Sequence, residues 1–192
     1  MPPLTAIYDA CVLYPAPLRD LLLRLALADL FRARWTADIH DEWIRQVLAN
    51  RPDLTHAQLL RTRRLMDAHV RDCLVEGYQV LIPQLHLPDP KDRHVLAAAI
   101  RAQARVIVTF NRRDFPPGIL VPYGVEAQHP DPFIAQWLDI APAQVCAAAE
   151  AQRRSLRNPP KSVDEFLAIL LRQGLPETVA RLRTACYNSE GA

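Results

Sequence analysis

The feature that most constrains the fold is a short apolar run at residues 105–110. Its centre, Val106 with Ile107 and Val108, is continuously apolar, so a strand formed there would be buried on both faces. Strands of this kind are typical of parallel sheets that are covered by helices on each side. The run therefore predicts a central strand of an α/β fold.

Other predicted strands and helices alternate with this run along the chain. Residues 4–9 form a short apolar segment that predicts a first strand, and residues 78–83 hold β-prone residues that predict a second. The predicted helices are one with leucines at positions 18, 21, 22 and 25, one capped by Asp38, one capped by Thr55 with Gln58, and one capped by Asp89 ahead of Pro90. Right-handed crossovers place such helices on both sides of a sheet, so this order predicts a mostly parallel central sheet.

From about residue 129 the pattern changes to helices alone. Residues 132–140, 142–156, 162–173 and 176–187 each predict a helix, and Ser162 with Glu165 forms a capping box. The chain has 192 residues and 50% of them are hydrophobic, which suffices for one sizeable core with a short appendage. We therefore expect one α/β domain over residues 1–128 and a helical extension over residues 129–192.

Charge, cysteine and hydropathy patterns narrow the class of protein. The net charge is only +2 and 23% of the residues are charged, so the totals neither require a polyanionic partner nor suggest disorder. The four cysteines at positions 11, 73, 146 and 186 form no CxxC or Cys/His cluster, which predicts buried thiols in a reducing compartment. The most apolar stretch, residues 18–31, contains charged side chains that a membrane core would not accept, and no secretory signal is visible. We expect a cytoplasmic protein without a membrane span.

Acidic and amide residues stand where the predicted strands end. Asp9 follows the first strand, Asp89 and Asp92 open the helix after the second, and Asn111 and Asp114 follow the third. Functional groups of a parallel sheet collect beyond the carboxyl ends of its strands. Several carboxylates there repel each other unless a hard divalent cation lies between them, and oxygen ligands favour magnesium or manganese over zinc. The sequence thus predicts a metal site at this edge.

Three segments follow one another in a recognisable order: residues 8–15 (YDACVLYP), 89–99 (DPKDRHVLAAA) and 108–116 (VTFNRRDFP). Together with an Asp-Glu pair after the first predicted helix, they resemble the PIN-domain ribonucleases, and among these the VapC-type toxins of bacterial toxin–antitoxin systems. The resemblance covers residues 4–128 and not the helical tail. It implies a PIN-like three-layer α/β/α fold.

The resemblance also implies which residues carry the chemistry. The four metal-binding acids of the family, which would be both catalytic residues and ligands of Mg²⁺ or alternatively Mn²⁺, fall on Asp9, Glu42, Asp92 and Asp114. Four further residues are candidates for substrate binding: Thr109, Asn111, Arg112 and Arg113.

Two placements stay open, because Asp41 lies beside Glu42 and Asp89 lies beside Asp92. We expect Glu42 to face the site, since Asp38 and Asp41 suit capping of their helix. We expect Asp92 to face the site as well, since Asp89 suits the N-cap, and the helix dipole keeps a first-turn aspartate ionised.

The function implied by the resemblance is metal-dependent hydrolysis of RNA phosphodiester bonds by the toxin of a type II toxin–antitoxin pair. A metal ion would lower the pKa of a bound water and stabilise charge on the leaving 3′ oxygen. The implied partners are an RNA substrate and a cognate antitoxin protein, and a homodimer stays open.

Two other functions fit the same residues. A non-catalytic module that binds nucleic acid or a protein partner would keep the fold, although the four acids argue against it. A nuclease directed at DNA would keep the chemistry, because an acid cluster cannot itself read a 2′-hydroxyl. His40 and His94 are predicted to be structural or exposed, as lone helical histidines usually are.

Overall fold

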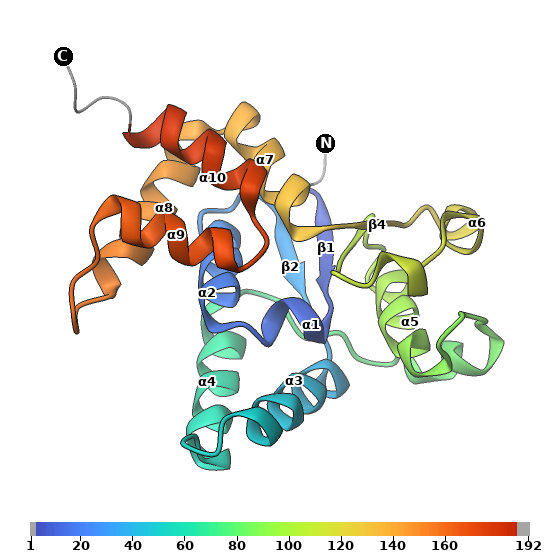
Figure 1. The fold of residues 1–192 in the computed structure, drawn as a ribbon. Coiled ribbons are helices and arrows are strands. Elements are labelled where there is room, and N and C mark those ends of the chain that lie inside the picture. The colour runs from blue at the N-terminus through green and yellow to red at the C-terminus, as the bar shows by residue number, and fades with distance from the viewer. Residues whose placement is uncertain (1–2, 188–192) are drawn as a thin grey trace. The chain divides into compact units, whose positions relative to one another are not determined.

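The computed structural model describes residues 3–187, which form two compact units (Figure 1). The first, here called the sheet unit, contains the chain up to Tyr14 and Phe31–His129. The second, here called the helical unit, contains Pro15–Leu30 and the chain from Pro130 onward. The segment Pro15–Leu30 therefore joins the C-terminal helices, although it lies between two strands of the sheet unit in the sequence.

The sheet has four parallel strands in the order β2-β1-β3-β4. Their bounds are β1 Thr5–Tyr8, β2 Arg32–Arg34, β3 Val106–Val108 and β4 Glu126–Gln128. The two central strands pair in register, with Tyr8 opposite Val108, and β3 is buried along its whole length. The prediction of an α/β fold with a central parallel sheet is confirmed, as are the strands expected at residues 4–9 and 105–110.

The second predicted strand is wrong. Residues Gln79–Gln84 form the 3₁₀ helix η1, in which the Leu81 amide donates to the carbonyl of Tyr78. Val80 is 73% exposed, so the β-prone side chains of this segment do not all enter the core. Strands β2 and β4 were not predicted, because they are three-residue edge strands that carry charged or amide side chains.

Helices of the sheet unit connect the strands and carry three of the four candidate acids, namely Glu42, Asp92 and Asp114. Their bounds are α1 Ala10–Leu13, α3 Ala37–Asn50, α4 His56–His69, η2 Pro90–Asp92, α5 Arg93–Arg101, η3 Arg112–Asp114, α6 Pro117–Leu120 and η4 Val121–Tyr123. The capping box of Thr55 with Gln58 on α4 and the cap of Asp89 on η2 are confirmed. Thr36 caps α3 by accepting from the Ile39 amide, so the prediction of Asp38 as its cap is wrong.

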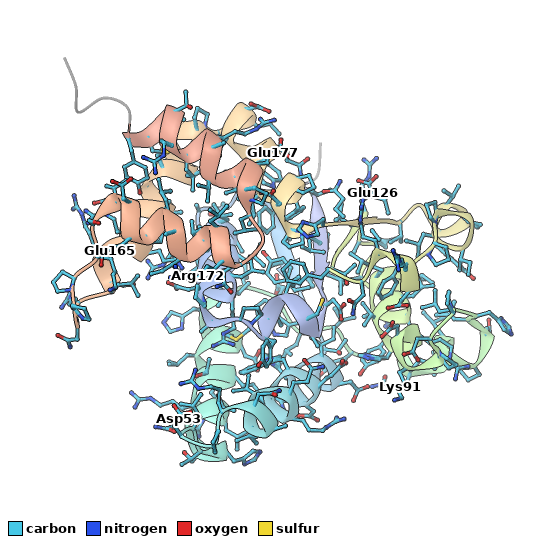
Figure 2. The ribbon with its side chains drawn as sticks, in the orientation of Figure 1. Asp53, Lys91, Glu126, Glu165, Arg172 and Glu177 are labelled. Carbon is cyan, nitrogen blue, oxygen red and sulfur yellow. A yellow bond between two sulfur atoms is a disulfide. The ribbon has the colours of Figure 1, made fainter. Side chains whose placement is uncertain are left out.

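The helical unit is built from α2 Ala16–Leu27, α7 Pro130–Ile140, α8 Pro142–Ser155, α9 Val163–Arg172, α10 Pro176–Leu182 and the π-helix η5 Arg183–Tyr187. The four leucines that predicted α2 are all buried. The capping box of Ser162 with Glu165 is confirmed, and Glu165 is labelled in Figure 2. The buried Asp131 caps α10 by accepting from the amides of Glu177 and Thr178.

The prediction of four thiols is wrong for one pair. Cys146 on α8 and Cys186 on η5 form a disulfide across a sequence separation of 40 residues, whereas Cys11 and Cys73 are free. The sequence did not predict this disulfide, because only the packing of α8 against η5 brings two cysteines so far apart in the sequence together. None of the helices between residues 3 and 187 is long and apolar enough to cross a membrane.

Candidate active site

Asp9 is held at the carboxyl end of β1, where its amide donates to the carbonyl of Val108 at 3.1 Å. Asp9 is 5% exposed, and its Oδ1 caps α1 by accepting from the Ala10 amide at 2.7 Å. Its other oxygen, Oδ2, accepts from the Thr109 hydroxyl at 2.7 Å and from the Cys11 thiol at 3.1 Å. The parallel pairing of β1 with β3 thus places the first acid against the end of the neighbouring strand.

Burial raises the pKa of Asp9, and the charge of Glu42 raises it further. The hydrogen bonds from Thr109, Cys11 and Ala10 act in the opposite direction, because they stabilise the carboxylate. Asp9 is therefore a buried acid whose ionised form is stabilised by these three hydrogen-bond donors. Burial also raises the pKa of the Cys11 thiol, with the charge of Asp9 as the second cause, so this thiol stays protonated.

A buried polar network fixes the orientation of α3. His40 is fully buried, and its Nδ1 accepts from Trp43 Nε1 at 2.9 Å. Its Nε2 therefore carries the proton and donates to Asp67 Oδ1 on α4 at 2.9 Å. Trp35 Nε1 donates to the same oxygen at 2.8 Å. The histidine has a structural role, as the sequence predicted, and it sets which face of α3 points toward the sheet.

This orientation separates Asp41 from Glu42. Asp41 pairs with Arg63 on α4 at 2.8 Å. Glu42 points the other way, with Oε2 lying 3.6 Å from Nε2 of His94 on α5, and its charge acts on both Asp9 and Asp92. The structure therefore places Glu42, and not its neighbour, among the acids at the sheet edge.

Asp92 is the residue on which the electrostatic interactions converge. Asp89 caps η2 by accepting from the Lys91 amide at 2.9 Å, and the exposed Lys91 is labelled in Figure 2. Asp92 follows at the start of α5, half-buried. Burial raises its pKa to about 7, and the further causes are the charges of four carboxylates, those of Asp9, Asp114, Asp89 and Glu42. Five acids, which lie on or cap four separate elements (α1, α3, η2 and η3), thus act on one another electrostatically.

Among residues 3–187, no group of three or more His, Cys, Asp or Glu side chains is arranged as a ready-made metal site. Carboxylates raise each other's pKa across separations of about 4–6 Å or more, whereas magnesium ligands lie about 2.1 Å from the ion. The acids are therefore close enough to repel each other, although their oxygens do not yet surround a common ion position. Their donor atoms are carboxylate oxygens, which suit a hard divalent cation, and such a cation would relieve the repulsion that the pKa of Asp92 records.

Asp114 lies beside a surface depression of about 310 Å³, which is lined by Phe110, Asn111, Arg112, Arg113 and Asp114. Asn111 and the two arginines are exposed, and neither guanidinium has an ion-pair partner in the described part of the chain. The depression therefore offers positive charge and an amide next to an acid of the cluster.

Thr109 differs from the other candidates for substrate binding. It is fully buried, its hydroxyl donates to Asp9, and its oxygen accepts from the Asn111 amide at 2.9 Å. Thr109 therefore acts on Asp9 and does not line the depression.

Two residues next to the acids were missed by sequence reasoning. Cys11 contacts Asp9 directly, and its position two residues later in the sequence was the only available signal. His94, which was predicted to be structural or exposed, has a side chain that is 15% exposed and lies against Glu42. Its position two residues after Asp92 gave no indication that it faces a different helix.

Comparison with known protein families identifies the sheet unit. The PIN domain family matches residues 5–113, more than half of the chain. The chain belongs to the PIN-domain family. The resemblance predicted from three short segments and the predicted PIN-like fold are confirmed, and residues 130–184 of this PIN-domain protein match a second family, the VapC50 C-terminal domain.

A curated relative of this PIN-domain protein comes from Mycobacterium tuberculosis (strain ATCC 25618 / H37Rv) and is named "Putative ribonuclease VapC50". The two are 38% identical over 107 residues, which is 56% of this chain and 62% of the relative. The chain thus spans less than two thirds of the relative that it matches. No solved structure matches it.

The raised pKa of Asp92 predicts how pH affects the stability of the metal-free protein. Between the ordinary value of 3.8 and about 7 the folded state binds more protons than the unfolded state, so stability falls as pH rises through this window. We expect Asp92→Asn, which cannot ionise, to raise the free energy of unfolding near pH 8 by about 1–2 kcal/mol, a value discounted for the half-exposed position. The gain should shrink toward zero near pH 4.

Urea unfolding in EDTA at the two pH values measures this difference. The control is Asp53→Asn, because Asp53 (Figure 2) is fully exposed and its partner Arg51 lowers its pKa, so its removal gives no gain at high pH. An Asp92→Asn protein no more stable than wild type near pH 8 would show that Asp92 does not carry the repulsion of the cluster.

Proposed function

We propose that this PIN-domain protein is a metal-dependent endoribonuclease and the toxin of a type II toxin–antitoxin pair. The observation that carries the proposal is the convergence of carboxylate charges on Asp92 at the carboxyl edge of a parallel sheet. Such a cluster is unfavourable without a cation, and a fold that retains it gains a site for phosphodiester hydrolysis. The name of the curated relative, a ribonuclease, supports RNA hydrolysis as the activity.

The residues that would hold Mg²⁺, or alternatively Mn²⁺, are Asp9, Glu42, Asp92 and Asp114. Asp89 is not in this set, because its carboxylate caps η2. A bound Mg²⁺ supplies a water of lowered pKa and stabilises charge on the leaving 3′ oxygen. Asp9 is held in place for this role by the three donors on its carboxylate.

Substrate would enter beside η3. Arg112 and Arg113 are exposed along the depression next to Asp114, where their guanidinium groups can each hold a phosphate of a single strand. Asn111 precedes them as the N-cap residue of η3 and lines the same depression, where its side-chain amide offers both a donor and an acceptor. Thr109 contributes through Asp9 and does not contact the substrate.

The toxin role is supported by two matches. The curated relative bears a VapC name, and residues 130–184 match the C-terminal domain family of the same name. We propose that the chain acts in the cytoplasm and that its partner is a cognate antitoxin protein. We propose that residues 1–128 form the nuclease domain and that residues 129–192 form a helical extension.

Substituting the acids should abolish cleavage of RNA. We expect Asp9→Asn, Asp92→Asn and Asp114→Asn, each assayed separately on a 5′-labelled single-stranded RNA with Mg²⁺, to lower the rate by at least about 100-fold. Glu42→Gln should do the same. The matched control is Asp41→Asn, which changes the neighbouring acid that pairs with Arg63 and should retain activity.

The same assay separates the competing functions. EDTA should stop the wild-type reaction and added Mg²⁺ should restore it. Cleavage that continues in EDTA or in Asp92→Asn would reject the metal mechanism, and equal cleavage of a matched single-stranded DNA would favour the DNA-directed alternative. A wild-type protein that binds Mg²⁺ but cuts neither strand would favour the non-catalytic module.

The exposed arginines should control substrate binding. We expect Arg112→Gln and Arg113→Gln to raise KM with little change in kcat, because they lose a phosphate contact that is equally strong in the ground state and the transition state. Each should lower the salt dependence of RNA binding by about 0.7 in a plot of log K against log salt. Arg61→Gln on α4, an exposed arginine outside the depression, should leave the slope unchanged. A slope that is unaffected by both substitutions would place the RNA elsewhere.

Expression of the chain alone should arrest bacterial growth if it is a toxin. We expect arrest with the wild type and normal growth with Asp92→Asn at equal protein levels, because the arrest depends on RNA cleavage. Colony counts and a blot of total RNA measure the two effects together. Normal growth with an active wild-type nuclease would reject the toxin role and leave the enzymatic one intact.

A further inference from the structure

The Cys11 sulfur occupies a place between three polar groups of the site. It lies 3.1 Å from Asp9 Oδ2, 3.4 Å from Thr109 Oγ1 and 3.3 Å from the Phe110 amide nitrogen. These groups come from the end of β1 and from the residues that follow β3. The Cys11 sulfur therefore connects the backbone amide of Phe110, which follows β3, to the carboxylate of Asp9, which follows β1.

The direction of each hydrogen bond follows from the donors that are available. The Phe110 amide can only donate, so the sulfur accepts there. The Thr109 hydroxyl uses its proton on Asp9 Oδ2 and accepts from the Asn111 amide. The single thiol proton is then best placed on Asp9, because a carboxylate is a stronger acceptor than a hydroxyl that already accepts.

These bonds use the two carboxylate oxygens of Asp9 unequally. Oδ2 accepts from both Thr109 and Cys11, whereas among residues 3–187 the Ala10 amide is the only donor to Oδ1. Each carboxylate oxygen offers about two acceptor positions. Oδ2 is therefore filled, and Oδ1 keeps one position without a donor.

We propose that Cys11 is a positioning residue for the metal site, whose thiol holds the Asp9 carboxylate so that Oδ1 faces the cation. The inference rests on the proposed function, since it assigns Asp9 to the metal. Two donors on Oδ2 from different strand ends resist rotation of the carboxylate, which one donor alone would permit. Cys11 acts through Asp9 and does not itself contact the metal or the substrate.

Calorimetric titration of the full chain with Mn²⁺ tests the proposal in Cys11→Ala and Cys11→Ser. Loss of a donor to a metal ligand commonly costs about 10–100-fold in metal affinity, so we expect Cys11→Ala to weaken Mn²⁺ binding by about 10-fold. Cys11→Ser keeps a donor on a shorter bond, so it should bind Mn²⁺ more tightly than Cys11→Ala. In RNA cleavage, Cys11→Ala should lower kcat at saturating RNA and leave KM for RNA unchanged.

The matched control is the other free cysteine. Cys73 is buried, and its thiol makes only long contacts to Asp67, at 3.7 Å from the carbonyl oxygen and 3.9 Å from Oδ1. Trp35 and His40 hold that Oδ1 at 2.8 and 2.9 Å without help from the thiol. Cys73→Ala therefore removes a buried thiol of the same unit without loosening α3 or contacting the four candidate acids, and it should leave Mn²⁺ affinity unchanged. If Cys11→Ala does not fold, Cys11→Val supplies the same loss of a donor with the space filled, and thermal unfolding reports the packing contribution for each variant.

The outcomes are distinct. Mn²⁺ affinity that is weakened in Cys11→Ala and restored toward wild type in Cys11→Ser supports the proposal. Wild-type affinity in Cys11→Ala, or equal losses in Cys11→Ala, Cys11→Ser and Cys73→Ala, would overturn it and leave the nuclease assignment standing. A wild-type chain that binds no divalent cation would overturn the proposed function and this inference together.

Discussion

The parallel pairing of β1 with β3 is the constraint on which the site depends. It sets the end of β1 beside the end of β3, so that Asp9 and Thr109, 100 positions apart in the sequence, share a hydrogen bond. Because both strands are buried and in register, this meeting point is held by backbone bonds and does not depend on flexible side chains. The other acids reach the same edge on helices and turns.

The acids at this edge repel each other. The repulsion is largest in effect at Asp92, whose pKa is raised to about 7 by burial and by four neighbouring carboxylates. The sheet unit offsets this effect for Asp9 by supplying three hydrogen-bond donors, and it leaves Asp92 with no comparable support from its own helix cap. The ionised form of Asp9 is thus stabilised by hydrogen bonds before a cation binds, whereas the ionised form of Asp92 is destabilised by the neighbouring charges.

The two units are stabilised by different kinds of interaction. The sheet unit uses buried β-branched strands and the network from Trp35 through Asp67 to His40, which orients α3 and with it Glu42. The helical unit uses leucine-rich faces, capped helix starts and the disulfide between Cys146 and Cys186. The two family matches follow this division except for Pro15–Leu30, which lies within the PIN-domain match and yet belongs to the helical unit.

The sequence by itself determined the central strands, the capped helices and the order of the acidic segments, because these depend on local patterns of apolar and capping residues. It did not determine the edge strands, since three residues such as Glu126–Gln128 carry no apolar signal and pair only because β3 is already in place. Only the tertiary structure decided that Glu42 and not Asp41 faces the acids, and that Cys11 touches Asp9. Both depend on how a helix or a thiol packs against distant residues, which spacing along the chain does not specify.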